Sequence, residues 1–251
     1  MDFFRPDIYK QSIYNIDFLE LKRHGIKCLL FDLDNTLLDF DKAEAHALTK
    51  ALDDARISVT DEMLGRYNKI NLTQWKLLEQ GKMTRDEVKI RRFKLLFQEF
   101  HIKVSPEKVA SNYQIYLGQG HYFIEGAQEV LEQLSKKYRI YVVTNGTLSV
   151  QIGRLKSSGI KKYLQGIFIS EEIGYNKPSV EYFEKCFAQI PHLKKENTVI
   201  IGDSLSSDIQ GGKNAGIKTI WFHRPQDQTD DPKPRPDYEI QSLKSLLDML
   251  E

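Results

Sequence analysis

Short apolar runs alternate with amphipathic helical segments from about residue 124 to the end of the chain, and a first apolar run stands apart at 27–32. The later strands are expected at 139–144, 167–170, 198–201 and 217–222, and the helices at 127–138, 148–158, 178–190, 208–214 and 243–250. Such alternation is typical of a parallel sheet covered by helices on both faces, so we expect an α/β fold. In such sheets, ligands bind beyond the carboxyl ends of the strands.

The segment between these two parts has a different pattern. Apolar residues recur there at helical spacing, Thr84 and Glu87 form a capping box, and Ser105 followed by proline marks another helix start. We find no strand pattern in it. The predicted domains are a core made of 1–41 and 122–251, with 1–26 as an N-terminal extension, and an all-helical insertion at 42–121. Because the chain leaves the sheet directly after its first strand, the insertion should lie over that edge as a lid.

Polar side chains gather where the predicted strands end. They are Asp32 and Asp34 after the first strand, Thr144, Asn145 and Gly146 after 139–144, Lys177 before the helix at 178–190, and Asp203 and Asp208 after 198–201. Alone, each group has another explanation: Lys177 could be a solvated surface lysine, Asp208 an exposed helix residue, and the others turn or helix-cap residues. Since parallel strands end at one edge of the sheet, we interpret them together as one site. Alternation along the strand should start Asp32 and Asp34 on the same side.

These residue types fit phosphoryl transfer. A phosphate ester is anionic and repels a carboxylate nucleophile, so cations must neutralise it. Asp32, Asp203 and Asp208 supply hard oxygen ligands suited to Mg²⁺, and Lys177 adds a second positive charge near the phosphate. Asp32 would attack phosphorus to give an aspartyl phosphate, while Asp34 would protonate the leaving oxygen and then activate water.

The phosphate oxygens also need hydrogen-bond donors. The Thr144 hydroxyl and the backbone N–H groups of Asn145 and Gly146 can hold the non-bridging oxygens, as the start of a helix does. Together with Lys177 they form the predicted phosphate-binding set.

With these residues in this order, the chain resembles the phosphatases of the haloacid dehalogenase superfamily. The similar motifs are Asp32-x-Asp34-x-Thr36, Thr144, Lys177 and Gly202-Asp203-x₄-Asp208, in order along about residues 27–222. The resemblance implies a Rossmann-like core with a helical cap inserted after the first strand. It implies Asp32 as nucleophile, Asp34 as acid/base, and Mg²⁺ bound by Asp32, the Asp34 backbone carbonyl and Asp203, with Asp208 supporting the metal directly or through water. Dehalogenases of the superfamily lack the second acid of the first motif, so Asp34 favours a phosphatase.

The insertion is similar to the cap of the superfamily's pyrimidine 5′-nucleotidases, which release phosphate from UMP, dUMP and dTMP. The similar stretches are 67–71, Trp75, 79–84 and 169–174. We interpret Trp75 as a core residue of the insertion rather than a pocket residue. Residues 3–30 depart from that subgroup and look like the entry segment of a capless branch, with a short helix expected at 16–21. The proline-rich residues 224–236 are expected to form an extended surface loop.

Composition limits the partners. The 36 basic and 35 acidic residues leave a net charge of +1, which gives no electrostatic reason to expect nucleic acid or an anionic membrane. No apolar run approaches about 18 residues, and no secretory signal pattern opens the chain. Cys28 and Cys186 are expected as unpaired, buried thiols. We expect a cytoplasmic enzyme, monomer or homodimer, acting on a small phosphorylated metabolite such as a nucleoside monophosphate.

Other functions stay open on the sequence alone. A phosphoglycolate or sugar-phosphate phosphatase, or a phosphomutase, would share the motifs and differ in the cap. A signalling receiver domain also places Asp, Thr and Lys around Mg²⁺ at strand ends, but Asp34 and the large insertion oppose that interpretation. A non-catalytic interaction protein is opposed by the intact motifs.

Overall fold

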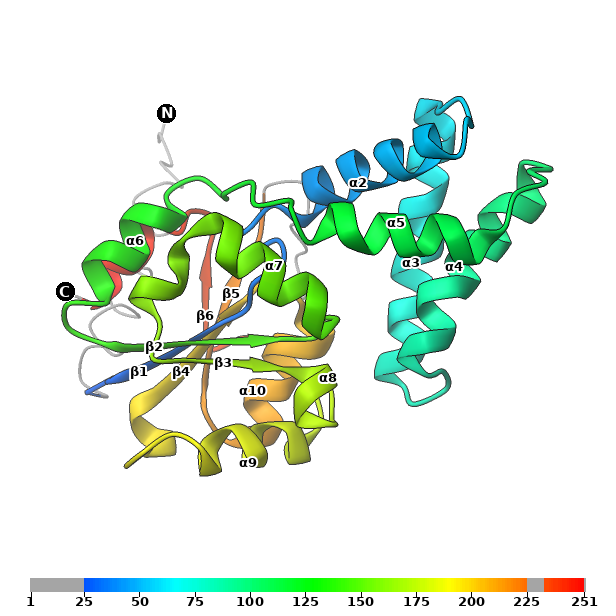
Figure 1. The fold of residues 1–251 in the computed structure, drawn as a ribbon. Coiled ribbons are helices and arrows are strands. Elements are labelled where there is room, and N and C mark those ends of the chain that lie inside the picture. Colours follow the sequence, from blue (N-terminus) through cyan, green and yellow to red (C-terminus); the bar gives the residue numbers. More distant parts are fainter. Residues whose placement is uncertain (1–24, 225–232, 251) are drawn as a thin grey trace, which may run out of the picture.

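The computed structural model describes residues 25–224 and 233–250. Within these residues, six parallel strands form one sheet in the order β3-β2-β1-β4-β5-β6 (Figure 1). The strands are β1 (Cys28–Phe31), β2 (Arg139–Thr144), β3 (Gly166–Ile169), β4 (Thr198–Gly202), β5 (Lys218–Phe222) and β6 (Tyr238–Ile240). Because β1 lies between β2 and β4, the residues that follow these three strands are neighbours. The prediction of an α/β fold with a Rossmann-like parallel sheet is confirmed.

Helices cover both faces of the sheet. One face packs against α6 (Ala127–Leu134), α7 (Leu148–Ser158) and α11 (Ser245–Leu250), and the other against α8 (Ser170–Ile173), α9 (Val180–Ala188) and α10 (Gln210–Ala215). Along β1, Leu29 and Phe31 join the first core, whereas Cys28 and Leu30 join the second. Burial on both faces explains why the central strands are continuous apolar runs. Two 3₁₀ turns at Ile160–Tyr163 and Lys195–Asn197 and a π-helical turn at Leu205–Ile209 complete the connections.

Four helices form a separate layer beyond the carboxyl ends of the strands (Figure 1). They are α2 (Phe40–Asp54), α3 (Asp61–Glu79), α4 (Arg85–Glu99) and α5 (Pro106–Leu117). The layer has its own apolar core, in which the rings of Tyr67, Phe93 and Tyr113 pack with centroids 5.1 to 5.6 Å apart. The Thr84–Glu87 capping box is present at the start of α4, and Ser105 caps α5.

Two short connections join this layer to the sheet, and they lie side by side. Residues 37–39 lead out to α2, and residues 122–124 lead back from α5. They are joined by a bridge between Leu38 and Phe123, a hydrogen bond from the Asp39 N–H to the Tyr122 carbonyl (2.8 Å) and one from the Ile124 N–H to the Leu37 carbonyl (3.1 Å). The chain therefore leaves and re-enters the core at almost the same point.

Helix α7 of the core touches the end of α5 through two glycines. A Cβ atom on Gly153 would lie 2.6 Å from the carbonyl oxygen of Gly118. Such a close approach of two backbones is available only to glycine. Gly153 therefore sets how near the helical layer lies to α7.

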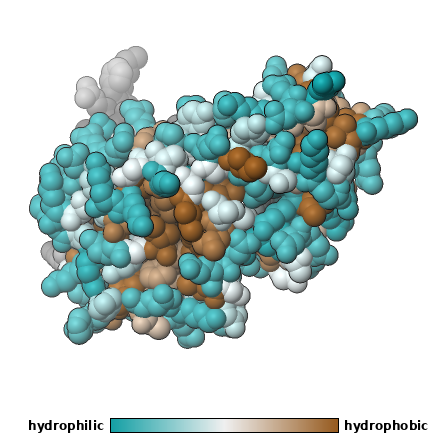
Figure 2. All heavy atoms as spheres, in the orientation of Figure 1, coloured by the Kyte–Doolittle hydropathy of each residue, from teal (hydrophilic) through white to brown (hydrophobic). Residues whose placement is uncertain are grey.

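The surface of the core and that of the helical layer differ. Figure 2 shows apolar side chains gathered over the core on this face, whereas the helical layer is mainly hydrophilic. In residues 25–224 and 233–250, no helix combines the length and the apolar character that crossing a membrane would need. Cys28 and Cys186 are buried and unpaired, as predicted.

Some expectations differ from the structure. Strand β6 is not predicted, because a three-residue strand whose middle side chain, Glu239, is partly exposed carries almost no apolar pattern. The helix expected at 208–214 begins earlier, as the π-helical turn that leads into α10. The short helix expected at 16–21, nearly all of the 1–26 extension and most of the proline-rich loop lie outside the described residues.

Candidate active site

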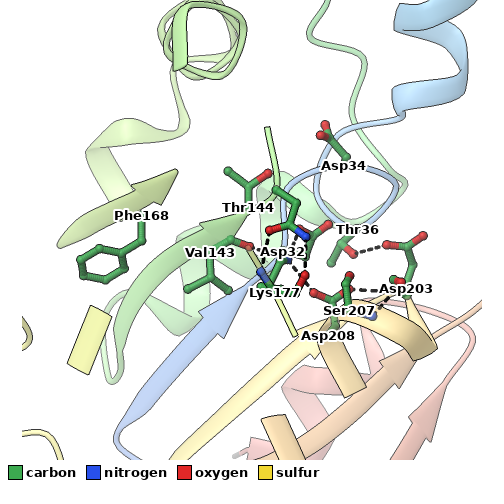
Figure 3. Close-up of polar contacts among 12 residues, drawn as sticks. Asp32, Asp34, Thr36, Val143, Thr144, Phe168, Lys177, Asp203, Ser207 and Asp208 are labelled. Carbon is green, nitrogen blue, oxygen red and sulfur yellow. Dashed lines mark hydrogen bonds and ion pairs between the residues drawn. The ribbon is translucent and has the colours of Figure 1, made fainter. Parts of the chain in front are cut away.

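Three carboxylates and one ammonium group meet at the carboxyl ends of β1 and β4 (Figure 3). Lys177 Nζ lies 2.6 Å from Asp32 Oδ1 and 2.6 Å from Asp208 Oδ1, and it donates a third hydrogen bond to the Val143 carbonyl at 2.8 Å. Asp203 completes the cluster, since carboxylate oxygens of Asp32, Asp203 and Asp208 lie within 4.8 Å of one another. The fold thus brings together four of the residues that the sequence assigns to the reaction and the metal.

The charges in this cluster do not balance. Burial raises the pKa of Asp32 to about 7; Lys177 opposes this rise, and the carboxylates of Asp208 and Asp34 add to it. Burial, followed by the Asp32 and Asp208 carboxylates, raises the pKa of Asp203 well above its usual value. Burial lowers the pKa of the Lys177 ammonium, but Asp208 and Asp32 outweigh it and the net pKa is raised. The excess negative charge would be neutralised by a bound cation.

The cluster fits Mg²⁺ by its chemistry. Carboxylate oxygens are the ligands that this ion prefers. Hydrogen bonds also hold two of the three carboxylates in place. Thr36 Oγ1 donates to Asp203 Oδ1 at 3.4 Å, and the Ser204 N–H donates to Asp208 Oδ2 at 3.1 Å. A Cβ atom on Gly202 would lie 2.3 Å from the Asp208 carboxylate, so this position must lack a side chain. Asp32 and Asp203 would hold the ion, with Asp208 beside it and bonded to Lys177.

Backbone contacts fix the two residues at the centre. The Asp32 N–H donates to the Ile201 carbonyl at 2.9 Å, which extends the contact between β1 and β4 by one residue. The Asn145 side chain binds the backbone of Lys177 twice, donating to its carbonyl and accepting from its N–H, both at 2.8 Å. Only the backbone of Asn145 is predicted to take part in the site, so this anchoring of the lysine is an additional role of its side chain.

Asp34 lies apart from the cluster and points away from it (Figure 3). Strand β1 ends at Phe31, and the chain then turns at Asn35, whose φ is 58° and whose side-chain oxygen accepts the Phe40 N–H at 2.9 Å. Strand alternation therefore does not extend to residue 34. Alternation therefore cannot place Asp34 relative to Asp32. The Asp34 carboxylate is not among the three that could hold a metal.

Two residues of α7 hold the Asp34 carboxylate instead. Arg154 Nη1 donates to Asp34 Oδ1, and Gln151 Nε2 donates to Asp34 Oδ2 at 2.7 Å. Arg154 is fully buried, and its Nε also donates to the Gly120 carbonyl at 2.9 Å. The sequence analysis misses both residues. Their three-residue spacing places them on one face of the helix. This spacing could have predicted their role only if that face were already known to lie against the site.

Of the predicted phosphate-binding residues, Thr144 and Gly146 lie against Gln151 of α7, whereas Lys177 lies in the carboxylate cluster. Thr144 is fully buried, and its hydroxyl oxygen accepts a hydrogen bond from Gln151 Nε2 at 2.9 Å. A Cβ atom on Gly146 would lie 2.4 Å from the Gln151 side chain, so that side chain packs directly over the glycine. Asn145 and Gly146 both line a cavity. Asp32, Lys177, Asp203 and Asp208 are not in its lining, and Asn145 connects it to the cluster through the hydrogen bonds to the Lys177 backbone.

This cavity, of about 430 Å³, extends from the sheet edge to the helical layer. On the sheet side its lining includes Asp34, Asn145 and Gly146, and on the helical side it includes Asn68, Asn71, Trp75 and Arg92. The volume is in the range of small-molecule sites. A phosphorylated metabolite could therefore place its phosphate at the sheet edge and its other part against α3 and α4.

Trp75 belongs both to the apolar packing and to the cavity. It is half-buried and packs against a small cluster of Leu78, Met83 and Val88, and it also lines the cavity. The interpretation of Trp75 as a core residue alone is therefore incomplete. The spacing of apolar residues along α3 does not show that one side of the ring is left open.

Comparisons with known proteins agree with this geometry. Residues 29–222 match the family model of haloacid dehalogenase-like hydrolases. The chain is 40% identical to the HAD-hydrolase YfnB of Bacillus subtilis (strain 168), covering 92% of this chain and 97% of the relative. It is 41% identical to the pyrimidine 5′-nucleotidase PynA of Streptococcus pneumoniae, covering 90% and 95%. A crystal structure of YfnB bound to magnesium, which reveals interdomain movement, matches with a TM-score of 0.85 over 90% of this chain and 99% of that one.

Proposed function

The chain belongs to the haloacid dehalogenase-like hydrolases and is a phosphatase of that family, and from this premise we propose that it is a Mg²⁺-dependent pyrimidine 5′-nucleotidase that forms an aspartyl phosphate. The observation that carries the proposal is the buried Asp32–Lys177–Asp208 contact with Asp203 beside it, next to a cavity that reaches the helical layer. The relative PynA, named as a pyrimidine 5′-nucleotidase, supports the choice of substrate.

In the first step, an Asp32 carboxylate oxygen attacks phosphorus. A bond forms between that oxygen and phosphorus while the bond from phosphorus to the nucleoside oxygen breaks, and Asp34 gives its proton to the departing oxygen. Lys177 holds the attacking carboxylate in place, since it contacts Asp32 Oδ1 at 2.6 Å. Bound Mg²⁺ would neutralise charge on the phosphate, which otherwise repels Asp32.

In the second step, a water molecule attacks phosphorus and gives a proton to Asp34. The bond between phosphorus and Asp32 breaks, which releases inorganic phosphate and restores the Asp32 carboxylate and the protonated Asp34. Because Arg154 and Gln151 hold the Asp34 carboxylate away from Asp32, Asp34 has to turn from α7 toward the substrate before it can act. We propose that substrate binding brings about this turn.

We also propose that the helices of residues 42–121 act as a cap over the site. The cavity lies between them and the sheet edge, and α4 already contacts the core: Arg85 Nη2 donates to Ser170 Oγ at 2.5 Å and to Asn176 Oδ1 at 2.7 Å. Lys89 forms an ion pair with Glu171 at 3.0 Å. Such a cap would exclude water from the aspartyl phosphate until the leaving group departs.

The proposal is tested by measuring phosphate release with Mg²⁺ and with EDTA. The substrates are UMP, dUMP, dTMP, AMP, phosphoglycolate and sugar phosphates. We expect metal-dependent release that is fastest with the pyrimidine nucleotides. Preference for phosphoglycolate or a sugar phosphate would keep the mechanism and reject the nucleotide, and no release from any substrate would reject both.

A further inference from the structure

The helical side of the cavity carries polar groups for which the reaction at phosphorus has no use. Asn68 and Asn71 of α3 and Arg92 of α4 line it, beside the ring of Trp75. Arg92 is only 1% exposed, although its charge is costly to bury. These groups line the helical side of the cavity, where the part of the substrate other than the phosphate would lie.

A buried carboxylate fixes the orientation of both amides. Glu44 of α2, which is 3% exposed, accepts from Asn68 Nδ2 at 2.9 Å and from Asn71 Nδ2 at 2.5 Å. The Asn71 oxygen accepts from Arg92 Nη1 at 2.8 Å. Because a guanidinium group only donates, the Asn71 amide has one possible orientation. Asn68 likewise turns its nitrogen toward Glu44.

These contacts leave two groups for a ligand. Among the described residues, no group donates to the Asn68 oxygen, and none accepts from Arg92 Nη2. The guanidinium cannot swing freely, because it lies over the rings of Tyr113 (4.6 Å to the centroid), Phe93 (5.6 Å) and Tyr67 (5.9 Å). Within this network, the cavity wall offers one hydrogen-bond acceptor, the Asn68 oxygen, and one fixed cationic donor, Arg92 Nη2. The Gln114 oxygen of α5, which is buried without a hydrogen-bond partner in the part of the chain that the structure describes, is a further acceptor on the same wall.

We infer that Asn68 and Arg92 bind the polar edge of the base, with Glu44 and Asn71 as positioning residues and Trp75 packing on the ring. This inference rests on the proposed nucleotidase function and deepens it by assigning its base-binding site. Uracil and thymine present an N–H next to a carbonyl oxygen, which matches the Asn68 acceptor and the Arg92 donor. Cytosine presents an unprotonated nitrogen in place of that N–H, and this nitrogen would face the Asn68 oxygen without a hydrogen bond.

The test compares Asn68→Ala with wild type on substrates that do and do not carry the base. The full-length proteins with Mg²⁺ are assayed on UMP, CMP and ribose 5-phosphate. We expect the ratio of kcat/KM for UMP to that for ribose 5-phosphate to fall about tenfold, as when one partner of a polar contact is removed. The preference for UMP over CMP should shrink with it. The matched control is Asn112→Ala, another cap asparagine bonded to a carboxylate (Asp54, 3.3 Å) but away from the cavity.

The outcomes separate this inference from the proposed function. Suppose that wild type hydrolyses UMP and that Asn68→Ala leaves the UMP to ribose 5-phosphate ratio and the UMP to CMP ratio unchanged, whether or not its activity falls equally on all three substrates. The base-binding assignment is then overturned while the nucleotidase function stands. If wild type hydrolyses ribose 5-phosphate but not UMP, both fall. Arg92→Lys keeps the positive charge but lacks the planar guanidinium fork that holds two donors in fixed directions, and we expect the same fall in the ratio. Should that variant unfold, Asn68→Ala decides alone, because Asn68 is exposed.

Discussion

At the scale of single residues, Lys177 is the group that allows Asp32 and Asp208 to lie close together. Its ammonium contacts one oxygen of each at 2.6 Å and is itself only 1% exposed. Without it, two buried carboxylates would face each other with no positive charge between them. In the proposed mechanism the same ammonium keeps the Asp32 oxygen in place for attack, so stability and reactivity would both depend on one side chain.

Replacing Lys177 by methionine should lower the free energy of unfolding of the metal-free protein by about 3–5 kcal/mol, because it leaves buried charges unpaired. Burial already raises the pKa of Asp32 to about 7, well above its unfolded value. A carboxyl group shifted upward binds more protons in the folded state, so its unfavourable contribution grows as pH rises toward that pKa. Urea unfolding in EDTA should therefore show a larger loss at pH 8 than at pH 5. A loss that does not depend on pH would contradict this explanation.

The Asp32→Asn variant should lose turnover by at least about 10³-fold, because no other group can accept the phosphoryl group. Its stability should stay within about 1 kcal/mol of wild type, since the change removes one of three clustered negative charges and an amide oxygen can still accept from Lys177. Initial rates and thermal unfolding check both points. Asp53→Asn on the exposed side of α2 is the matched control. Substantial turnover by Asp32→Asn would reject its role as nucleophile.

Asp34→Asn should slow hydrolysis of UMP more than hydrolysis of p-nitrophenyl phosphate. The nucleoside oxygen needs a proton to leave, whereas p-nitrophenolate leaves readily without one. The comparison uses kcat for both substrates at one pH. Equal losses on the two substrates would argue against Asp34 as the general acid.

At the scale of helices and strands, the contact between α7 and the end of α5 links the two parts of the molecule. Helix α7 carries Gln151 and Arg154, which hold Asp34, and the Arg154 side chain also binds the Gly120 carbonyl at 2.9 Å. A displacement of the segment after α5 would therefore reach Asp34 through Arg154 and α7.

Gly153→Ala tests this link. Its new Cβ would lie 2.6 Å from the Gly118 carbonyl oxygen, so backbone must move, and we expect a loss of about 1–3 kcal/mol in stability together with a lower kcat/KM for nucleotides. The control is Gly65→Ala in α3, where a Cβ meets nothing within 4 Å. There the same change should raise stability by about 0.4–1 kcal/mol. Thermal unfolding of the two variants distinguishes a steric effect from an effect of helix propensity. Equal shifts in melting temperature would contradict the proposed steric contact between Gly153 and Gly118.

Whether a feature is predictable from the sequence depends on where it lies along an element. Helix α7 is predicted over its whole length because Gly159 ends it in the left-handed conformation, with φ at 71°. Asp32 and Thr144 are predicted because each ends or directly follows a strand, and parallel strands bring their ends together. The role of Arg154 is not predicted, because it depends on how α7 is rotated about its own axis against the sheet. Helix rotation is set by tertiary packing rather than by local pattern.

The same distinction applies to the helical layer. Its helices and the Thr84 cap follow from local sequence, whereas the contacts among Glu44, Asn71 and Arg92 join three different helices. No spacing within a single helix reports such contacts. Trp75 is a second example of what the sequence pattern cannot show. Its ring packs partly in the apolar core and partly lines the cavity, yet its position along α3 fits the pattern of an ordinary core residue.

At the scale of the whole molecule, a metal ion bound by the proposed carboxylate site would couple metal binding to folding. A ligand that binds only the folded state at 100 times its dissociation constant adds about 2.7 kcal/mol of stability. We expect EDTA to abolish turnover and to lower the melting temperature relative to Mg²⁺ buffer. Asp203→Asn should remove most of this difference, because it deletes one of the carboxylates grouped at the site. A melting temperature that does not respond to Mg²⁺ in wild type would contradict the site.

The paired connections at Leu38 and Phe123 have a consequence for how such a molecule can change over generations. Because they meet side by side, removing everything between them would leave two ends close enough for a short turn, and inserting a different helical unit there would add little loop-closure entropy. The sheet that carries the nucleophile could then be inherited unchanged while the inserted unit is lost, exchanged or enlarged. A lineage built in this way can acquire new substrates by recombination at one position, without having to evolve its chemistry again.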